Sequence, residues 1–153
     1  MPQDDRLIYL ITRAQHSLMA HLKKELNARG NSITPVQAGI LFLLRKNAHT
    51  MTKLSRSLSI DNSAITGLVD RLEKSGLAQR TADPADRRTY LIRITEKGKA
   101  EIDRAYVTIK RVNEEIKSGF SADEIETFKR VLNSLHDRFA KDASGNNRNL
   151  RKA

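Results

Sequence analysis

The side chains of this chain that are best suited to recognising another molecule are short, polar and closely spaced. Asn62, Ser63 and Thr66 stand with Gly67 at the start of a segment of helical periodicity. An asparagine side chain can bond adenine at two positions, and serine or threonine hydroxyls can bond several bases. Gly67 would let a helix backbone approach a DNA groove closely. The same residues also fit the solvated polar face of an ordinary surface helix. The neighbouring segments are therefore needed to distinguish a DNA-reading helix from a surface helix.

A pair of adjacent arginines, Arg87 and Arg88, forms the second candidate group. Two neighbouring guanidinium groups repel each other, and the plainest use for them is contact with phosphates or insertion into a narrow minor groove. The alternative is that Asp83 or Asp86 holds one arginine within a turn. That alternative explains one of the two arginines more readily than both.

The segment that contains Asn62, Ser63 and Thr66 is predicted to be a helix. Asp61 precedes a periodic apolar stripe as the expected N-cap, and Gly76 follows it as the expected end. We therefore predict a helix over residues 62–75 with the short polar residues on its outward face. The stripe consists of the four apolar residues at i, i+3, i+4 and i+7, namely Ile65, Leu68, Val69 and Leu72.

A β-hairpin has to carry the arginine pair. Asp83 and Pro84 are typical turn residues. After the arginines, Tyr90, Ile92 and Ile94 alternate with other residues, as in a strand with one covered face. The hairpin therefore places both arginines at or near its tip.

A short helix over residues 51–58, capped by Thr50, is expected to support the helix that follows it. Its apolar residues pack inward, while Lys53 and Arg56 face outward toward phosphates. Arg80, in the first strand of the hairpin, is a third candidate for phosphate contact. The two helices and the hairpin together predict a winged helix-turn-helix.

Four more helices are predicted outside this region from apolar spacing and capping patterns. The first of these helices begins near Leu7 and ends at Gly30, and the second begins at the capping box of Thr34, Pro35 and Gln37 and ends near Lys46. The third begins after Thr95, and the fourth begins at the capping box of Ser121 and Glu124. The predicted fold is mainly α-helical, with a small β-hairpin wing and long N- and C-terminal dimerisation helices.

The apolar seams of the first and the last two helices most simply bury each other and those of a second copy, which predicts an isologous homodimer. The alternative is a monomeric helical hairpin.

Positive charge is concentrated in the middle of the chain. Residues 51–100 carry 10 basic and 6 acidic side chains, whereas residues 101–142 carry 8 basic and 9 acidic side chains. We therefore expect residues 1–30 and 99–142 to form the dimerisation region, 34–98 the DNA-binding region and 143–153 a flexible basic tail.

Composition narrows the possible partners. The 153 residues include 28 Lys and Arg against 18 Asp and Glu, a net charge of +10 that favours a polyanion. No apolar run approaches the roughly 20 residues that span a bilayer, and the first residues are acidic where a signal peptide would be basic. We expect a cytoplasmic protein that binds double-stranded DNA and no membrane. The absence of cysteine excludes disulfides and thiol switches.

No enzyme motif is found in the sequence, and we predict no catalytic residues, metal or cofactor. The four histidines lack the HExxH spacing, and neither a Gly-rich phosphate loop nor a GxSxG elbow occurs. His16 and His21 would share a helical face poorly, which favours interface or surface roles over a metal or ligand site.

Three stretches carry a resemblance to the MarR family of bacterial transcription regulators: LVDRLEKSGL at 68–77, DPADRR at 83–88 and LIRITEKG at 91–98. The resemblance extends over most of the chain. It implies a homodimer in which Ser63 and Thr66 enter the major groove and Arg87 or Arg88 reaches the minor groove. The chain departs from the family pattern at Gly67, where many relatives carry a larger residue, and at Ala78.

The resemblance also implies that a small ligand, such as an aromatic acid or a phenol, controls DNA binding. Tyr9, Arg13 and His16 on or beside the first helix are candidates for meeting such a ligand. The alternative is that these three side chains make interface hydrogen bonds. A ligand acts only if it binds one spacing of the two DNA-reading helices better than another.

The sequence therefore predicts a dimeric transcription regulator, expected to be a repressor, on a pseudo-palindromic operator with half-sites about one helical turn apart. A nonspecific or architectural nucleic-acid-binding protein is the first alternative, because it would need only the charge. A protein-interaction module built on the winged fold is the second. It would function without Arg87 and Arg88.

Overall fold

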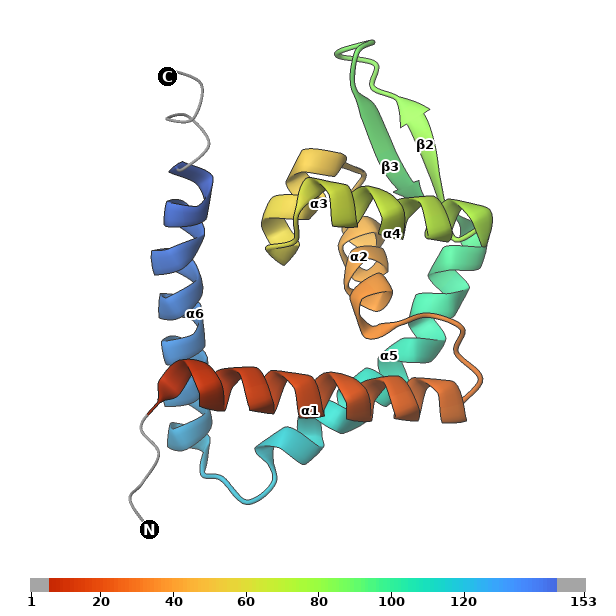
Figure 1. Ribbon diagram of the computed structural model, residues 1–153. Helices are drawn as coiled ribbons and strands as arrows, with labels where there is room; N and C mark the ends of the chain where they lie inside the picture. The colour runs from red at the N-terminus through yellow and green to blue at the C-terminus, as the bar shows by residue number, and fades with distance from the viewer. Residues whose placement is uncertain (1–5, 146–153) are drawn as a thin grey trace. The chain divides into compact units, whose positions relative to one another are not determined.

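A computed structural model of the chain describes residues 6–145 (Figure 1). Six helices and three short strands follow one another in this part of the chain. They are α1 (Leu7–Ala28), α2 (Pro35–Lys46), β1 (His49–Thr50), α3 (Met51–Leu58), α4 (Asn62–Lys74), β2 (Ala78–Ala82), β3 (Tyr90–Ile94), α5 (Glu96–Lys117) and α6 (Ala122–Gly145). The predicted mainly helical fold with a small β-hairpin wing is confirmed.

Local capping explains where most of the helices begin. The Thr34 side chain accepts from the N–H of Gln37, whose side chain in turn accepts from the N–H of Thr34. Thr50 accepts from Lys53, and Thr95 accepts from Gly98 at the start of α5. At α6, Ser121 and Glu124 form the second predicted capping box.

The expectation for Asp61 is only half correct. The residue occupies the N-cap position of α4, but its side chain accepts no hydrogen bond from the helix. The first turn of α4 is therefore left without a side-chain cap. The first three residues of this turn, Asn62, Ser63 and Ala64, are exposed.

The sheet has three antiparallel strands in the order β1-β3-β2. Strands β2 and β3 form the wing, the hairpin over residues 78–94, in which Arg80 lies opposite Ile92. Strand β1 pairs His49 with Ile92 and was not predicted, because two residues carry no readable alternation. The pairing with β1 makes β3 the central strand.

Tyr90 corrects the predicted strand face. Ile92 is fully buried and Ile94 half-buried, but the Tyr90 side chain is 61% exposed. Tyr90 is the first residue of β3, on the wing side of the strand, and it lies opposite exposed Ala82. Core burial therefore covers only the inner part of this strand.

One apolar core joins the helices to the sheet. The largest side chains that it buries completely come from five helices and one strand, namely Leu26, Ile40, Leu41, Leu54, Ile65, Val69, Leu72, Ile92 and Ile102. All three fully buried residues of α4 belong to the stripe predicted for that helix. The polar face of α4 is consequently turned outward.

The described residues divide into two compact units, one up to Val112 and one from Asn113 onward. In the first, α1 exposes Leu7, Ile8 and Tyr9 near its start. In the second, α6 exposes Phe128 and Phe139. Helix α6 continues to Gly145, three residues into the expected tail, and the rest of that tail lies outside the described residues.

None of the helices within residues 6–145 combines the length and the apolar character needed to cross a membrane.

Candidate nucleic-acid interface

Helices α3 and α4 are joined by a tight turn. Ser59 adopts the left-handed conformation at φ 52°, and the N–H of Ile60 returns to the carbonyl of Ser55 at 3.0 Å. The turn folds α3 back so that Leu54 enters the core, while Lys53 and Arg56 remain exposed. The exposure of both cations agrees with the outward orientation expected for them.

The start of α4 presents the predicted short polar side chains to the outside. Asn62, Ser63 and Thr66 are all exposed. The Thr66 hydroxyl donates to the carbonyl of Asn62 at 2.7 Å, so its oxygen is left as an acceptor and its methyl group as an apolar contact. A Cβ added at Gly67 would meet nothing within 4 Å, so this face of the helix is flat and open.

The tip of the wing is organised by its two aspartates. Asp83 accepts from the N–H of Ala85 at 2.9 Å, and Asp86 accepts from the N–H of Arg88 at 3.0 Å and from the Thr89 hydroxyl at 3.2 Å. The carboxylates thus bind the backbone of the turn.

The two arginines at the tip are exposed, and within the described residues neither guanidinium has an ion pair. The alternative in which Asp83 or Asp86 holds one arginine within the turn is met only by the backbone of Arg88, whose N–H donates to Asp86. Arg87 and Arg88 both remain available to a phosphate or a groove.

Arg80 differs from the other candidates because two carboxylates of α4 hold its guanidinium. Its Nη2 lies 2.7 Å from Asp70, and its Nε lies 3.1 Å from Glu73. Sequence reasoning did not find these two ion pairs. The signal available was the spacing of Asp70 and Glu73, which puts both on one face of a helix that ends just before the strand of Arg80.

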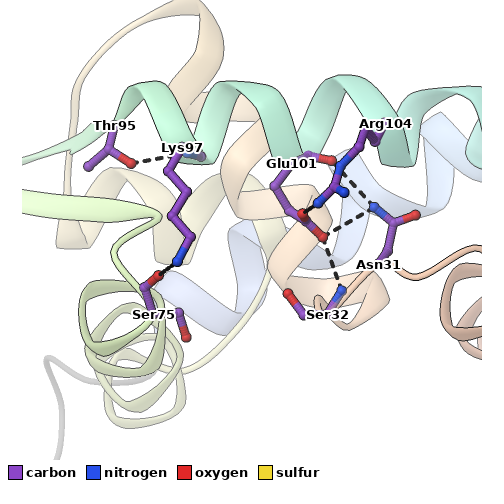
Figure 2. A network of polar contacts seen from close by, with 8 residues as sticks. Asn31, Ser32, Ser75, Thr95, Lys97, Glu101 and Arg104 are labelled. Atoms are coloured by element: carbon purple, nitrogen blue, oxygen red, sulfur yellow. Dashed lines mark hydrogen bonds and ion pairs between the residues drawn. The ribbon is translucent and has the colours of Figure 1, made fainter.

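Residues at the start of α5 form hydrogen bonds with the C-terminal end of α4. The Lys97 ammonium donates to the carbonyl of Ser75 at 2.9 Å (Figure 2). The Thr95 hydroxyl donates to the carbonyl of Gly76 at 2.6 Å. Gly98 packs so tightly that an added Cβ would collide with the carbonyl of Leu77. These contacts fix the C-terminal end of α4 against α5.

A buried carboxylate ties α5 to the turn between α1 and α2. Glu101 accepts from the side chain of Asn31 at 3.1 Å and from the N–H of Ser32 at 3.0 Å, and it pairs with Arg104 (Figure 2). Burial alone would raise the pKa of Glu101, but these hydrogen bonds and the charge of Arg104 outweigh it and lower the pKa. Glu101 is therefore an ionised anchor.

His49 lies buried just before α3. Burial lowers its pKa, the nearby charge of Lys53 lowers it further, and a hydrogen bond with the backbone of Leu43 partly opposes both. The lowered pKa favours the neutral imidazole, so His49 does not add to the positive charge that the exposed cations of α3 supply.

The three candidate ligand contacts lie on α1, and all are exposed. The Arg13 guanidinium stacks over the Tyr9 ring, with its carbon 5.4 Å from the ring centre, and Arg6 does the same at 5.0 Å. His16 follows Arg13 by three residues on the same helix. The structure brings Tyr9 and Arg13 into contact with each other.

Comparison with known proteins gives one family. The chain matches the family model described as the MarR family over residues 33–90. It is 28% identical over 128 residues to the HTH-type transcriptional regulator MhqR of Bacillus subtilis. The aligned region covers 83% of this chain and 87% of MhqR.

Solved structures agree with this match. A probable transcriptional regulator from Pseudomonas aeruginosa is 32% identical with a TM-score of 0.77, over 86% of this chain and 98% of that one. CouR from Rhodococcus jostii RHA1, solved bound to p-coumaroyl-CoA, is 28% identical with a TM-score of 0.76, over 86% of this chain and 92% of that one. CouR, described as a transcriptional repressor, has also been solved on a 23-mer DNA duplex.

Proposed function

This chain belongs to the MarR family of transcriptional regulators, and on that premise we propose that it is a sequence-specific repressor that binds a pseudo-palindromic operator as a homodimer. The observation that carries the proposal is the presence of two exposed groups on one compact unit. These are the short polar face of α4 and the two arginines at the wing tip. A nonspecific binder needs only charge and has no need for the first group.

The exposed groups suit different parts of a duplex. Asn62, Ser63 and Thr66 would read base edges in the major groove, and Gly67 would allow the helix backbone to come close. Arg87 and Arg88 would enter the adjacent minor groove. Lys53 and Arg56 would bind phosphates and hold the register.

We propose that the dimer forms through residues 1–30 and 99–142, while residues 34–98 bind DNA. Exposed apolar side chains on α1 and α6 support this division, since single helices rarely leave residues such as Ile8, at 83%, and Phe139, at 57%, uncovered in the working assembly. A symmetric dimer would present two copies of α4 to half-sites about one helical turn apart.

Ligand control is the finer part of the proposal. CouR was solved both with p-coumaroyl-CoA and on DNA, which supports an aromatic or phenolic effector here. Tyr9, Arg13 and His16 supply a ring, a cation and an imidazole that would suit a phenol or a carboxylate. The alternative use of these residues is hydrogen bonding between subunits.

The test is fluorescence anisotropy of the purified protein on the intergenic DNA beside its own gene, against a shuffled duplex, at about 150 mM salt where nonspecific attraction is screened. We expect a preference of about a thousandfold or more for the operator fragment. Equal affinity for every genomic fragment tried would favour the architectural alternative. An absence of binding to all of them would favour the protein-interaction module.

A further inference from the structure

We infer that Arg80 is a positioning residue for DNA recognition, acting through Asp70 and Glu73 and not by binding a phosphate. It ties the root of the wing to α4 and masks two carboxylates that follow the proposed base-reading residues. The inference rests on the proposed function, because it concerns how the two DNA-contacting groups are held in register.

The strand geometry aims Arg80 at α4. Arg80 lies directly opposite Ile92 across the β2–β3 ladder, and directly opposed residues point to the same face of a sheet. Since the Ile92 side chain is fully buried, the stem of Arg80 starts beside the core. The guanidinium then reaches the outer edge of α4, where it meets Asp70 and Glu73.

One guanidinium serves both carboxylates. Its Nη2 contacts Asp70 at 2.7 Å, and its Nε contacts Glu73 at 3.1 Å. Residues three apart on a helix are neighbours, so both acids reach the same cation, Asp70 through a hydrogen bond and Glu73 through an ion pair. The Arg80 side chain is only 33% exposed in this position.

The charge of this group argues against phosphate binding. Two carboxylates and one guanidinium leave the trio negative, in contrast to the wing-tip arginines, which have no ion pair within the described part of the chain. Asp70 lies four residues after Thr66 and Glu73 lies seven after it, which places both acids on the face of α4 that carries Thr66. Without Arg80, both negative charges would face an approaching phosphate backbone.

The same contact sets the direction of the wing. Only the residues from Ser75 to Leu77 join α4 to β2 along the chain, and Gly76 there has φ +73°. Arg80 adds a side-chain tie beyond this joint. The β2–β3 ladder continues beyond Arg80 to the pair Ala82 and Tyr90. The direction of the strands at Arg80 therefore determines where the tip lies relative to Thr66.

A double-mutant comparison tests the inference. Arg80→Met is made in the wild-type protein and in the Asp70→Asn, Glu73→Gln background, and the ratio of operator to shuffled-duplex affinity is measured for each. We expect a loss of about tenfold in the wild-type background, as for residues of one network, and less than about twofold where both acids are neutral. The ratio cancels general charge effects on DNA binding.

Arg93→Met is the matched control. Arg93 is the other arginine within the strands of the wing, and its Nε donates to the Thr81 hydroxyl at 3.1 Å. Its loss removes the same charge, and we expect the ratio to stay unchanged. If Arg80 bound a phosphate instead, Arg80→Met would weaken binding equally in both backgrounds and lower the salt slope by about 0.9, which overturns the inference.

The outcome separates this inference from the proposed function. A wild-type ratio near one for every genomic fragment contradicts the function itself. A high wild-type ratio that Arg80→Met leaves intact contradicts only the role of Arg80. Circular dichroism melting shows whether each variant is folded, and Arg80→Gln replaces Arg80→Met if the methionine variant does not fold.

Discussion

Lys97, the second residue of α5, donates a hydrogen bond from its ammonium group to the carbonyl oxygen of Ser75, 2.9 Å away at the C-terminal end of α4. The last carbonyls of a helix have no partner within that helix, and a cation there also meets the negative end of the helix dipole. The proposed DNA-reading helix is thus completed by a residue of the next helix. Its stability depends on where α5 begins.

Replacing Lys97 by Met should lower the free energy of unfolding by about 0.5–1 kcal/mol, because the Ser75 carbonyl loses its charged donor. Urea denaturation at fixed protein concentration measures this loss. Lys99→Met is the control, since Lys99 pairs at the surface with Glu96 of its own helix. Equal losses for the two variants would show that the contact with Ser75 contributes nothing particular.

Replacing Glu101 by Gln should destabilise the protein by about 2 kcal/mol, because the buried carboxylate accepts from Asn31 and Ser32 and pairs with Arg104. A glutamine offers one acceptor oxygen and an amide that cannot accept. Glu126→Gln removes an exposed pair with Lys129 and should cost less than about 0.5 kcal/mol. Comparable losses in both variants would contradict the anchoring role.

The same residue predicts a pH dependence. The pKa of Glu101 is lower in the folded protein than its ordinary value of 4.5. The unfolded chain therefore takes up this proton first as the pH falls, so the stability from Glu101 is present above pH 4.5 and is lost below it, through the folded pKa. Melting temperatures between pH 6 and pH 3, roughly, should fall less steeply for Glu101→Gln than for the wild type. Parallel slopes would place the acid sensitivity elsewhere.

Replacing Arg87 or Arg88 by Ala should weaken operator binding by about 1–3 kcal/mol each and leave the melting temperature nearly unchanged. Both side chains are exposed, so folding does not depend on them. Anisotropy titrations and thermal melts are the paired measurements. Arg130→Ala is the control: it removes an exposed arginine side chain from α6 and should leave operator affinity unchanged. If the wing-tip variants bind as the wild type does, the minor-groove assignment is wrong.

Replacing Gly67 by Ala should stabilise the protein by about 1 kcal/mol, because alanine favours the helix and its methyl group enters open space. Operator affinity should nevertheless fall if the helix backbone approaches the groove as closely as proposed. Denaturation and DNA titration of one preparation give both values. A more stable variant with undiminished affinity would show that no close approach occurs there.

Gly98→Ala provides the opposite case for the stability measurement. An added methyl group would collide with the carbonyl of Leu77 and crowd the side chain of Ile94. We expect a destabilisation of about 2 kcal/mol or more from this overpacking. The contrast between the two glycines shows whether open space or tight packing decides the sign.

Replacing Thr66 by Val keeps the shape and the methyl group but removes the hydroxyl. We expect a change of about 1–3 kcal/mol in preference at one operator position, measured by competition among single-base-pair variants. Ser63→Ala should shift a different position, which serves as the control for site specificity. A uniform loss across all variants would assign Thr66 to the phosphate backbone.

Much of the fold follows from interactions that span only a few residues. The capping boxes at Thr34 and Ser121, the cap at Thr50 and the apolar stripe of α4 predicted helix starts and the buried face, because each depends on neighbours within one or two turns. The short polar residues of α4 and the arginines of the turn were recognisable for the same reason. Their chemistry and their spacing are both local properties.

Contacts between distant residues were decided only by the tertiary structure. The pairing of His49 with Ile92 across 43 positions made a strand that no local pattern indicates. The exposure of Tyr90 depends on where the core ends, and the anchoring of Glu101 by Asn31 bridges 70 positions. Arg80 was the instructive case. Its type and place were readable, but its task depended on two carboxylates that packing brought within reach, since an exposed cation binds whichever anion the fold puts nearest.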